Sequence, residues 1–248
     1  MCYNGDGQKM RNIFTLPRQI IYWTKVGECC EIGDGMDIKL DRPNDVENWT
    51  ELILIYSSAL KQVETKLEIL NDEFQHVHRY NPIEHIKSRI KTSESIVKKL
   101  KKHGYESTLD NMVLHVKDIA GIRVICSFTS DIYEIAEIIS NQRDIKVVSV
   151  KDYIVNPKPS GYKSYHMIVT VPVYLSDRII DTKVEIQIRT VAMDFWASLE
   201  HKMNYKFEGN APESLKQELV ECAKIVAELD DKMVSLNREV QSYKVGGK

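Results

Sequence analysis

The residues best suited to chemistry lie in the segment 151–166, which reads KDYIVNPKPSGYKSYH. Side chains alternate between the two faces of a strand. If the last residues of this segment form a strand, one face of it carries an aromatic ring, a hydroxyl and an imidazole. These are Tyr162, Ser164 and His166. Lys151 and Lys158 flank the preceding loop as cations suited to phosphate. An aromatic plane beside cations suits a nucleotide polyphosphate, although a half-exposed sheet face with a turn would give the same pattern.

A second segment, TKVEIQIRT at 182–190, alternates between apolar and polar side chains. Its polar face carries a carboxylate, an amide and a guanidinium in order, at Glu185, Gln187 and Arg189. The alternation predicts a strand with one buried face. A plain amphipathic strand has the same alternation, but these polar groups could hold a metal and a phosphate beside the first segment.

The third segment, DIAGIRVICSF at 118–128, is apolar enough for a buried strand. Asp118 stands at its start and Arg123 interrupts the apolar run, and a charge there is costly unless it is paired or works at a site. Gly121 predicts a bulge or a close backbone approach. Alternation puts Asp118 and Arg123 on opposite faces, so both can serve one ligand only through a bulge or a strong twist.

A fourth segment, KSRIKTSESIVKKLKKH at 87–103, is strongly basic although the whole chain has a formal net charge of −2. Lys91, Ser95 and Lys99 recur every four residues, which places them along one face of a helix. A solvated helix surface is the simplest interpretation. A group of residues that binds polyphosphate is the sharper one.

Together these segments resemble the synthetase domain of the RelA/SpoT family, in particular the small alarmone synthetases of the RelP and RelQ types. The matching stretches are SRIKTSESIVKK (88–99), HVKDIAGIRVICSF (115–128), VKDYIVNPKPSGYKSYH (150–166) and VEIQIRTVAMDFWASLEHKMNYK (184–206). They are long, in order and correctly spaced. The resemblance implies a nucleotidyltransferase-like core and a pyrophosphokinase, which moves the β,γ-pyrophosphate of ATP to the 3′-hydroxyl of GTP or GDP and releases AMP.

The resemblance also implies a role for each matching residue. On the ATP side the matching residues are Arg89, Lys91, Ser95, Lys99 and Arg123, and the two arginines would sandwich adenine. On the guanine side they are Lys151, Lys158, Tyr162, His166, Gln187, Arg189 and Asp194, and the tyrosine would stack on guanine. Some relatives carry asparagine in place of Asp194, but a carboxylate offers two acceptors to the N–H and NH₂ of guanine. From its spacing in the sequence, Asp194 would share one helical face with Ser198, His201 and Tyr205, behind the polar strand.

The catalytic residues implied by the resemblance are Asp118, Glu185 and His166. Asp118 and Glu185 would bind Mg²⁺, a cation that prefers carboxylates together with phosphate oxygens. Glu185 would also accept the proton of the 3′-hydroxyl, which is a poor nucleophile while protonated. His166 would lie by the phosphates. Such a site needs no Gly-rich phosphate loop, and no GxxxxGK[ST] occurs in the sequence.

The predicted architecture is α/β, with a mixed sheet of about five strands flanked by helices. We expect strands near 119–128, 145–155, 163–172 and 182–190, with one more unassigned, and helices near 46–80, 92–104, 130–141, 190–206 and 212–243. The first and last helices each carry a heptad seam, which suits either packing on the sheet or helix association. The resemblance implies a homotetramer.

Three parts of the chain are expected: a loosely ordered extension at 1–44, the synthetase domain at 45–243 and a frayed tail at 244–248. No hydrolase domain is expected, because the segment before the first long helix is too short for a core of its own. The sequence has no apolar run of about 18 residues that would span a membrane. Five cysteines without a CxxC favour reduced thiols and a cytoplasmic protein.

Two rival functions stay open from the residues themselves. A nucleotidyltransferase that moves a nucleoside monophosphate would use similar carboxylates and cations, but it would release pyrophosphate and not AMP. An RNA-binding regulator could use the basic segment and the tyrosines, because stacking aromatics and cations also suit single strands. The acidic overall balance weighs against RNA as the main partner, and single-stranded RNA binding is expected at most as a secondary activity.

Overall fold

The computed structural model describes residues 22–23, 29–30, 45–207 and 211–245. The chain divides into two compact units, Met1–Asp37 and Ile38–Lys248. Of the first unit, the described residues form one antiparallel pair, β1 (Tyr22–Trp23) with β2 (Cys29–Cys30). The loose order predicted for residues 1–44 falls almost wholly outside the described residues, as do residues 246–248 of the predicted frayed tail at 244–248.

The second unit is built on a five-stranded mixed sheet, as the sequence predicted. In spatial order its strands are β3 (Ile83–Ile90), β4 (Ala120–Cys126), β7 (Ile179–Thr190), β6 (Tyr165–Tyr174) and β5 (Lys146–Asp152). β4 and β7 are parallel, and every other neighbouring pair is antiparallel. β3 is the strand that we could not assign. Its sequence, IEHIKSRI, is mostly polar and half exposed, as befits an edge strand.

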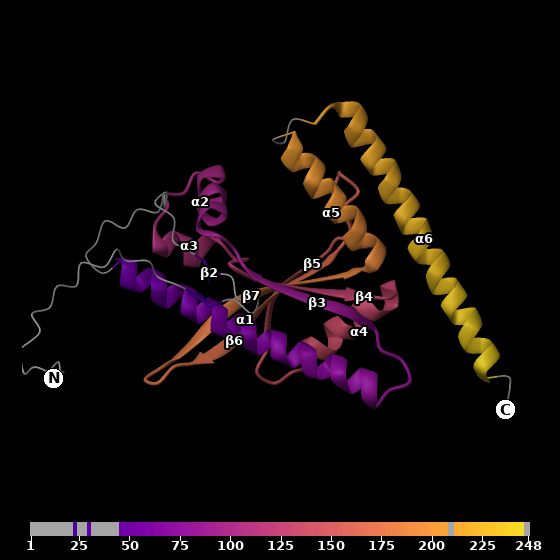
Figure 1. Ribbon diagram of the computed structural model, residues 1–248, viewed down its shortest axis with the longest axis horizontal. Helices are drawn as coiled ribbons and strands as arrows, with labels where there is room; N and C mark the ends of the chain where they lie inside the picture. Colours follow the sequence, from indigo (N-terminus) through magenta and orange to yellow (C-terminus); the bar gives the residue numbers. More distant parts are fainter. Residues whose placement is uncertain (1–21, 24–28, 31–44, 208–210, 246–248) are drawn as a thin grey trace, which may run out of the picture. The chain divides into compact units, whose positions relative to one another are not determined.

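Helices surround this sheet (Figure 1). They are α1 (Asp45–His76), α2 (Ser93–Lys102), α3 (Leu109–His115), α4 (Thr129–Ser140), α5 (Val191–Lys206) and α6 (Glu213–Val245). The sequence reading missed α3, which is too short to show a helical period. Thr108 and Thr92 cap α3 and α2 through hydroxyls that accept backbone N–H groups. Helix α6 includes Lys244 and Val245, which we had expected to fray.

One face of the sheet is apolar and α1 covers it, in contact with β3, β4, β6 and β7 (Figure 1). The heptad seam of α1 supplies the buried side chains of Trp49, Tyr56, Leu60, Val63 and Leu67. The sheet supplies Ile122, Val124, Met167, Val169 and Ile186. This seam therefore packs on the protein's own sheet, the simpler of the two interpretations that its pattern allowed.

The opposite face of the sheet carries a polar row that crosses all five strands. Register pairs join its members in turn: Lys87, Arg123, Gln187, His166 and Lys151. Paired residues of neighbouring strands point to the same face of a sheet. The parallel pair β4–β7 therefore puts Arg123 next to Gln187, although the two are far apart in sequence.

Helices α5 and α6 pack against each other beside this polar face. Ala223 of α6 is buried in a cluster with Tyr162, Trp196 and Ala197. Along the outer side of α6 run exposed apolar residues: Leu215, Ile225, Leu229, Met233, Leu236 and Val240. The heptad seams of the first and last helices therefore have different surroundings. No helix among the described residues is both long and apolar enough to span a bilayer.

Candidate active site

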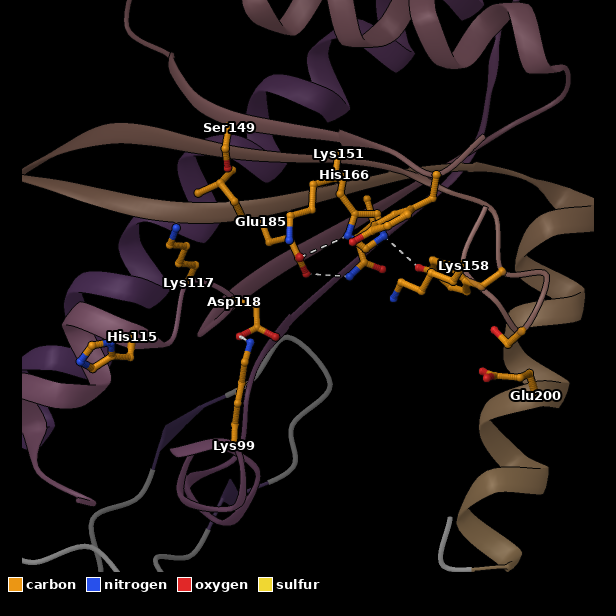
Figure 2. Close-up of a pocket in the computed structure, with 15 residues that line it drawn as sticks. Lys99, His115, Lys117, Asp118, Ser149, Lys151, Lys158, His166, Glu185 and Glu200 are labelled. Atoms are coloured by element: carbon orange, nitrogen blue, oxygen red, sulfur yellow. Dashed lines mark hydrogen bonds and ion pairs between the residues drawn. The ribbon is translucent and has the colours of Figure 1, made fainter. Parts of the chain in front are cut away.

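A pocket of about 460 Å³ opens on the polar face of the sheet (Figure 2). It is lined by Lys99, His115, Lys117, Asp118, Ser149, Lys151, Tyr153, Lys158, Ser160, Tyr162, His166, Ile168, Glu185, Gln187 and Glu200. These residues come from strands β5, β6 and β7, from α2, α3 and α5, and from the loops between. Segments predicted from sequence to share a site therefore do meet at one cavity.

Asp118 lies in the turn before β4 and is held by two lysines. Lys91 Nζ lies 2.5 Å from one of its carboxylate oxygens and Lys99 Nζ lies 2.7 Å from the other. Burial alone would raise the pKa of Asp118, but the two lysines outweigh it and hold the pKa below its usual value. The carboxylate is therefore ionised at neutral pH.

Of the two predictions for Gly121, a bulge or a close backbone approach, the bulge is absent, because β4 pairs regularly with β3 and β7 around this residue. Strand alternation does not apply to Asp118, which precedes the strand. Asp118 can therefore reach the polar face without any distortion of β4. Lys91 lies between β3 and α2, so it approaches Asp118 from a linker while Lys99 approaches from the helix.

Glu185 lies in the middle of β7, half-buried, and lines the same pocket as Asp118. Gln187 Nε2 donates to its Oε2 at 2.6 Å, and His166 Nδ1 lies 3.4 Å from its Oε1. Burial raises the pKa of Glu185 and nearby Asp118 adds to this, but the contacts from His166 and Gln187 outweigh both and lower the pKa. Glu185 is therefore a carboxylate that can accept a proton or bind a cation.

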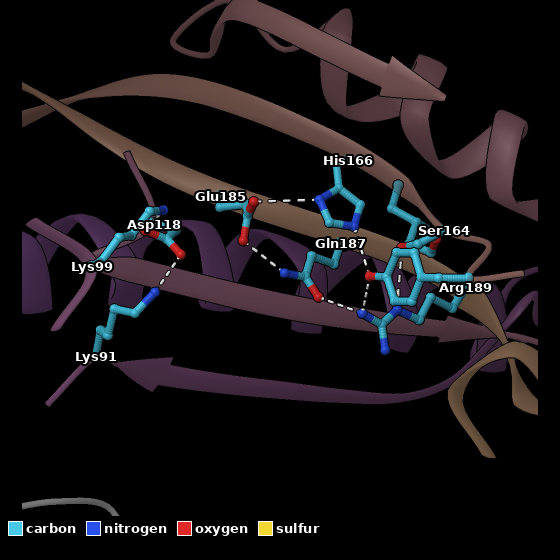
Figure 3. A network of polar contacts seen from close by, with 10 residues as sticks. Lys91, Lys99, Asp118, Ser164, His166, Glu185, Gln187 and Arg189 are labelled. Atoms are coloured by element: carbon cyan, nitrogen blue, oxygen red, sulfur yellow. Dashed lines mark hydrogen bonds and ion pairs between the residues drawn. The ribbon is translucent and has the colours of Figure 1, made fainter. Parts of the chain in front are cut away.

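The side chains around Glu185 form a closed ring of hydrogen bonds (Figure 3). Gln187 joins Glu185 to Arg189, whose Nη2 donates to Gln187 Oε1 at 2.8 Å and also to the hydroxyl of Tyr162. That hydroxyl contacts His166 Nε2 at 2.9 Å, and His166 returns to Glu185. Both nitrogens of the His166 imidazole are thus engaged, so the closed cycle of hydrogen bonds fixes the orientation of each side chain in it.

The predicted face of Tyr162, Ser164 and His166 converges, although β6 begins only at Tyr165. Ser164 is fully buried and its hydroxyl accepts from Arg189 Nε at 3.2 Å. Tyr162 reaches the ring from the loop before the strand, and not by strand alternation. All three side chains therefore meet Arg189 or each other, as expected, by a different local path.

Lys158 and Tyr162 belong to a tight turn in which Gly161 has φ +87° and its N–H donates to Lys158 O at 2.8 Å. A positive φ is easy for glycine and strained for other residues. The ammonium of Lys158 lies 4.4 Å from the centre of the Tyr162 ring and 4.8 Å from that of Tyr153. Burial lowers the pKa of Lys158, and Glu200 partly offsets this. The turn thus presents a cation and an aromatic ring at one wall of the pocket.

Asp194 was predicted to read the guanine edge, but its carboxylate is already engaged. Its Oδ1 accepts from Arg123 Nη1 at 2.9 Å and from Arg189 Nη1 at 3.2 Å, and its side chain is 13% exposed. Asp194 is also not among the residues that line the pocket. Base reading by Asp194 would require these ion pairs to rearrange around a nucleotide, and it stays a prediction.

The predicted helical face of α5 is wrong in part. Ser198 and His201, grouped with Asp194 in the sequence reading, are exposed. The residues of α5 that turn inward are Met193, Trp196 and Ala197, and Glu200 lines the pocket. Trp196 fixes which face of α5 points inward, because its ring is buried and its indole N–H donates to Leu219 O of α6.

Three residues predicted for the ATP side, Arg89, Ser95 and Arg123, are not among those that line the pocket. Arg89 is exposed on β3, opposite Gly121 of β4. Ser95 is exposed in the first turn of α2, where its backbone N–H donates to Thr92 Oγ1. Arg123 is held by Asp194, and its buried Nε has no hydrogen-bond partner among the described residues. Arg89 and Ser95 are thus exposed, whereas Arg123 is engaged with Asp194.

Several lining residues were missed by the sequence reading: His115, Lys117, Ser149, Tyr153 and Glu200. Ser149 could have been found, because it lies two residues before Lys151 on the same face of β5. His115 and Lys117 depend on the unrecognised helix α3. Whether Glu200 reaches the pocket depends on which face of α5 points inward, and the pattern of polar residues predicted a different face.

Comparison with known proteins points to one family. Residues 88–210 match the region found in RelA and SpoT proteins. A GTP pyrophosphokinase of Bacillus subtilis, YwaC, is 47% identical over 209 residues, which cover 83% of this chain and 100% of YwaC.

Solved structures agree with this match. The structure of the small alarmone synthetase 1 of Bacillus subtilis bound to its product pppGpp has a TM-score of 0.74 at 35% identity and covers 79% of this chain and 99% of that one. The structure of the same synthetase bound to AMPCPP has a TM-score of 0.69 at 33% identity, with 79% and 99% covered. Because YwaC is 47% identical and is matched along its whole length, and because residues 88–210 match the family region, the chain belongs to the RelA/SpoT family.

Proposed function

We propose that this protein is a GTP pyrophosphokinase that makes pppGpp or ppGpp, transferring the β,γ-pyrophosphate of ATP to the 3′-hydroxyl of GTP or GDP. The observation that carries the proposal is the ionised pair Asp118 and Glu185, which line one pocket together with lysines and a tyrosine. Phosphoryl-type transfer asks a protein mainly for positioning and charge neutralisation, and the pocket supplies both. Similarity to the GTP pyrophosphokinases YwaC and YjbM of Bacillus subtilis, at 47% and 35% identity, supports the same activity.

In the proposed reaction the 3′-oxygen forms a bond to the β-phosphorus of ATP. The bond from that phosphorus to the oxygen bridging the α- and β-phosphates breaks, and AMP leaves. Glu185 accepts the proton of the 3′-hydroxyl, for which its lowered pKa keeps it ionised at neutral pH. Gln187 and His166 hold the carboxylate in place through the contacts described above.

The pair Asp118 and Glu185 also fits Mg²⁺. The described residues contain no group of three or more His, Cys, Asp or Glu side chains placed to hold a metal alone. Mg²⁺ needs fewer protein ligands, since it usually binds one or two carboxylates and takes its other ligands from water and substrate phosphates. Bound there, it would neutralise charge on the transferring phosphates.

The two nucleotides would lie on opposite sides of this carboxylate pair. On the ATP side, Lys91 and Lys99 would bind phosphates, while Arg89 and Arg123 flank the adenine, with Ser95 at the end of α2. On the guanine side, the ring of Tyr162 would stack on the base. The other guanine-side residues are Lys151, Lys158, His166, Gln187, Arg189 and Asp194, of which all but Arg189 and Asp194 line the pocket.

The decisive experiment incubates the protein with γ-labelled ATP, Mg²⁺ and either GTP or GDP. The label should appear in pppGpp or ppGpp, and unlabelled AMP should accumulate in equal amount. Release of labelled pyrophosphate with a nucleoside monophosphate on the acceptor would instead support the nucleotidyltransferase alternative. Added ppGpp with Mn²⁺ serves as a control for hydrolysis, which we do not expect. Since ATP and GTP are cytoplasmic nucleotides, we propose that the enzyme acts in the cytoplasm.

We further propose a homotetramer that uses the outer face of α6. Leu229 and Leu236 lie on that face and remain 50% and 46% exposed in the single chain. Replacing both residues with glutamate should reduce the oligomer size in light scattering and leave the circular dichroism spectrum unchanged. Monomeric behaviour of the unmodified protein would contradict the proposal, and so would unfolding of the double variant.

Single-stranded RNA is a second proposed partner, at a different surface. Lys98, Lys101 and Lys102 are exposed on α2, and none of them lines the pocket. Such a surface would bind RNA through phosphates and lose affinity steeply as salt rises. A filter-binding titration at two salt concentrations tests this, with a triple glutamine variant as the control.

A further inference from the structure

Gly121 lies in the middle of the sheet on its polar face, at a position where a side chain is expected. It belongs to β4, and its register partners are Arg89 of β3 and Glu185 of β7. Its neighbours across both strands therefore point functional groups to the same face. Between Arg89 and Glu185 the face of the sheet is bare backbone.

Nothing in the fold requires glycine at this position. Gly121 is not among the described glycines with positive φ, which are Gly104 and Gly161. A Cβ built on Gly121 would meet no atom within 4 Å, whereas a Cβ on Gly161 would lie 2.5 Å from Ala223 Cβ. The pairing of β4 is also regular around Gly121. The two glycines therefore differ: the fold needs Gly161 and tolerates a side chain at Gly121.

Glycine in a strand has a cost. It loses more backbone entropy on folding than other residues and offers no side chain to pack, so it destabilises a strand relative to alanine. Glycine inside a strand commonly marks a place where a ligand or another backbone approaches closely. Because a Cβ on Gly121 would meet no atom within 4 Å, no described part of the protein makes that close approach, and a ligand is the candidate that is left.

The surroundings of the bare backbone indicate which ligand approaches. Arg89 is the direct partner of Gly121, and Arg123 follows two residues along β4, so the two arginines are diagonal neighbours. Diagonal neighbours in an antiparallel pair are about 7–8 Å apart. A flat ring in van der Waals contact with a plane on each side needs about 7 Å, twice the usual contact distance of about 3.5 Å. A planar base can therefore stand between the two arginines, over the other diagonal of the same four residues, which runs from Gly121 to Lys87 and has no side chain at Gly121.

We propose that Gly121 is a specificity-determining residue of the ATP side: its missing side chain leaves the floor on which the purine of ATP rests between Arg89 and Arg123. The proposal rests on the proposed function and adds a residue to it. A side chain here would rise from the floor into the position of the base. It would not reach the guanine side, which lies beyond Glu185 on β6 and in the loop before it.

The test is a graded series, Gly121→Ala and Gly121→Val, with Thr170→Val as the matched control. Thr170 is half-buried on β6 of the same sheet, pairs with Lys183 and does not line the pocket. Valine favours strands, so Gly121→Val should unfold at an equal or higher temperature than the unmodified protein. The KM for ATP should rise about tenfold or more for valine, and less for alanine, as expected when bulk occupies a fitted pocket. The KM for GTP should stay within about twofold in all variants.

Three results would overturn the proposal. They are an unchanged KM for ATP in Gly121→Val, an equal rise in KM for ATP and GTP, and a lower unfolding temperature that shows glycine to be a structural requirement. Calorimetric titration of AMPCPP without an acceptor keeps this test separate from the proposed reaction. If the unmodified protein makes no alarmone, the proposed function fails. Weaker AMPCPP binding by Gly121→Val, with unchanged binding by Thr170→Val, would still support the role of Gly121.

Discussion

The ATP side and the guanine side of the site hold their side chains in different ways. On the ATP side Lys91 and Lys99 are 17% and 34% exposed, and both contact Asp118. On the guanine side Arg189 is 5% exposed and bonds to Ser164, Gln187, Asp194 and the hydroxyl of Tyr162. One side is therefore a set of partly exposed lysines around one carboxylate, and the other is a buried network.

This difference teaches how each side should respond to change. A buried network in which every member is satisfied rigidifies the site, but removing one member leaves unpaired polar groups in the interior. Guanine-side substitutions should therefore affect folding and binding together. ATP-side substitutions should affect binding alone, because solvent can replace the lost contact.

The largest effect is expected where the two sides meet, at the carboxylate pair. Glu185→Gln and Asp118→Asn should each lower kcat by at least about 10²-fold, as for loss of a general base or of a metal ligand. Each change keeps the shape of the side chain, so the unfolding midpoint in urea should move little. Steady-state kinetics and urea titrations measure both quantities. Near-normal turnover in a well-folded Glu185→Gln protein would remove Glu185 from the mechanism.

The contrast between the sides is tested most directly at Tyr162. Tyr162→Ala should weaken the guanine nucleotide by about 1–3 kcal/mol, the usual scale for stacking of a base on an aromatic ring. It should also lower the free energy of unfolding by about 3–5 kcal/mol, because the ring is buried against Trp196 and Ala223. ATP affinity should stay almost unchanged. Calorimetric titrations with GTP and with AMPCPP, alongside urea unfolding, check these expectations.

Tyr162→Phe is the matched control for this prediction. It keeps the ring and loses only the hydroxyl that contacts Arg189 and His166. Guanine stacking should survive, while the buried guanidinium loses one acceptor and stability falls by about 1–3 kcal/mol. An equal loss of ATP and GTP affinity in Tyr162→Ala would show that the two sides are not separate.

Asp194 sharpens the comparison because it contacts both Arg123 and Arg189. If it reads guanine, Asp194→Ala should raise the KM for GTP and narrow the preference for guanosine over inosine nucleotides by about tenfold or more. If it only holds the two arginines, discrimination should persist while the protein loses stability. Asp194→Asn keeps an acceptor and should lie between these outcomes. The ratio of kcat/KM values for GTP and ITP decides between them.

The smallest effect is expected at Asp230 of α6, which joins this helix to the end of β7. Its Oδ2 accepts from Thr190 Oγ1 at 2.8 Å, and burial raises its pKa above the ordinary value of 3.8. The unmodified protein should therefore lose stability as the pH rises from 3.8 through the raised pKa, because the folded state must ionise a buried acid. Asp230→Asn keeps an acceptor and avoids this loss. At pH values above the raised pKa of Asp230, the Asp230→Asn variant should be more stable than the unmodified protein by about 0.5–1.5 kcal/mol in urea titrations. This gain should vanish below pH 3.8.

Much of the fold and site could be predicted from sequence because the informative residues lie on strands. The alternation of TKVEIQIRT placed Glu185, Gln187 and Arg189 on one face, and the structure joins them by hydrogen bonds. The mixed five-strand sheet was also predicted, except for the identity of β3. Strand periodicity survives folding because it follows from backbone geometry alone.

The features that could not be predicted depend on tertiary contacts. The rotation of α5 follows from the burial of Trp196 against α6, which no polar pattern reveals. The engagement of Asp194 depends on two arginines from different strands. The two heptad seams looked alike in sequence, yet Leu67 of α1 is buried and Leu229 of α6 is half exposed, because α1 packs on the sheet whereas α6 packs mainly on α5 and α4.

The parallel pairing of β4 with β7 also has a consequence for biosynthesis. Ala120 of β4 pairs with Val184 of β7, so β4 can gain this neighbour only after β5, β6 and β7 have been synthesised. A chain leaving the ribosome can pair β3 with β4 early, but Asp118 meets Glu185 only after β7 has inserted between β4 and β6. Long-range pairing of this kind is slow, because the connecting chain must be ordered first. The newly made polypeptide should therefore consume no nucleotide until its sheet is complete.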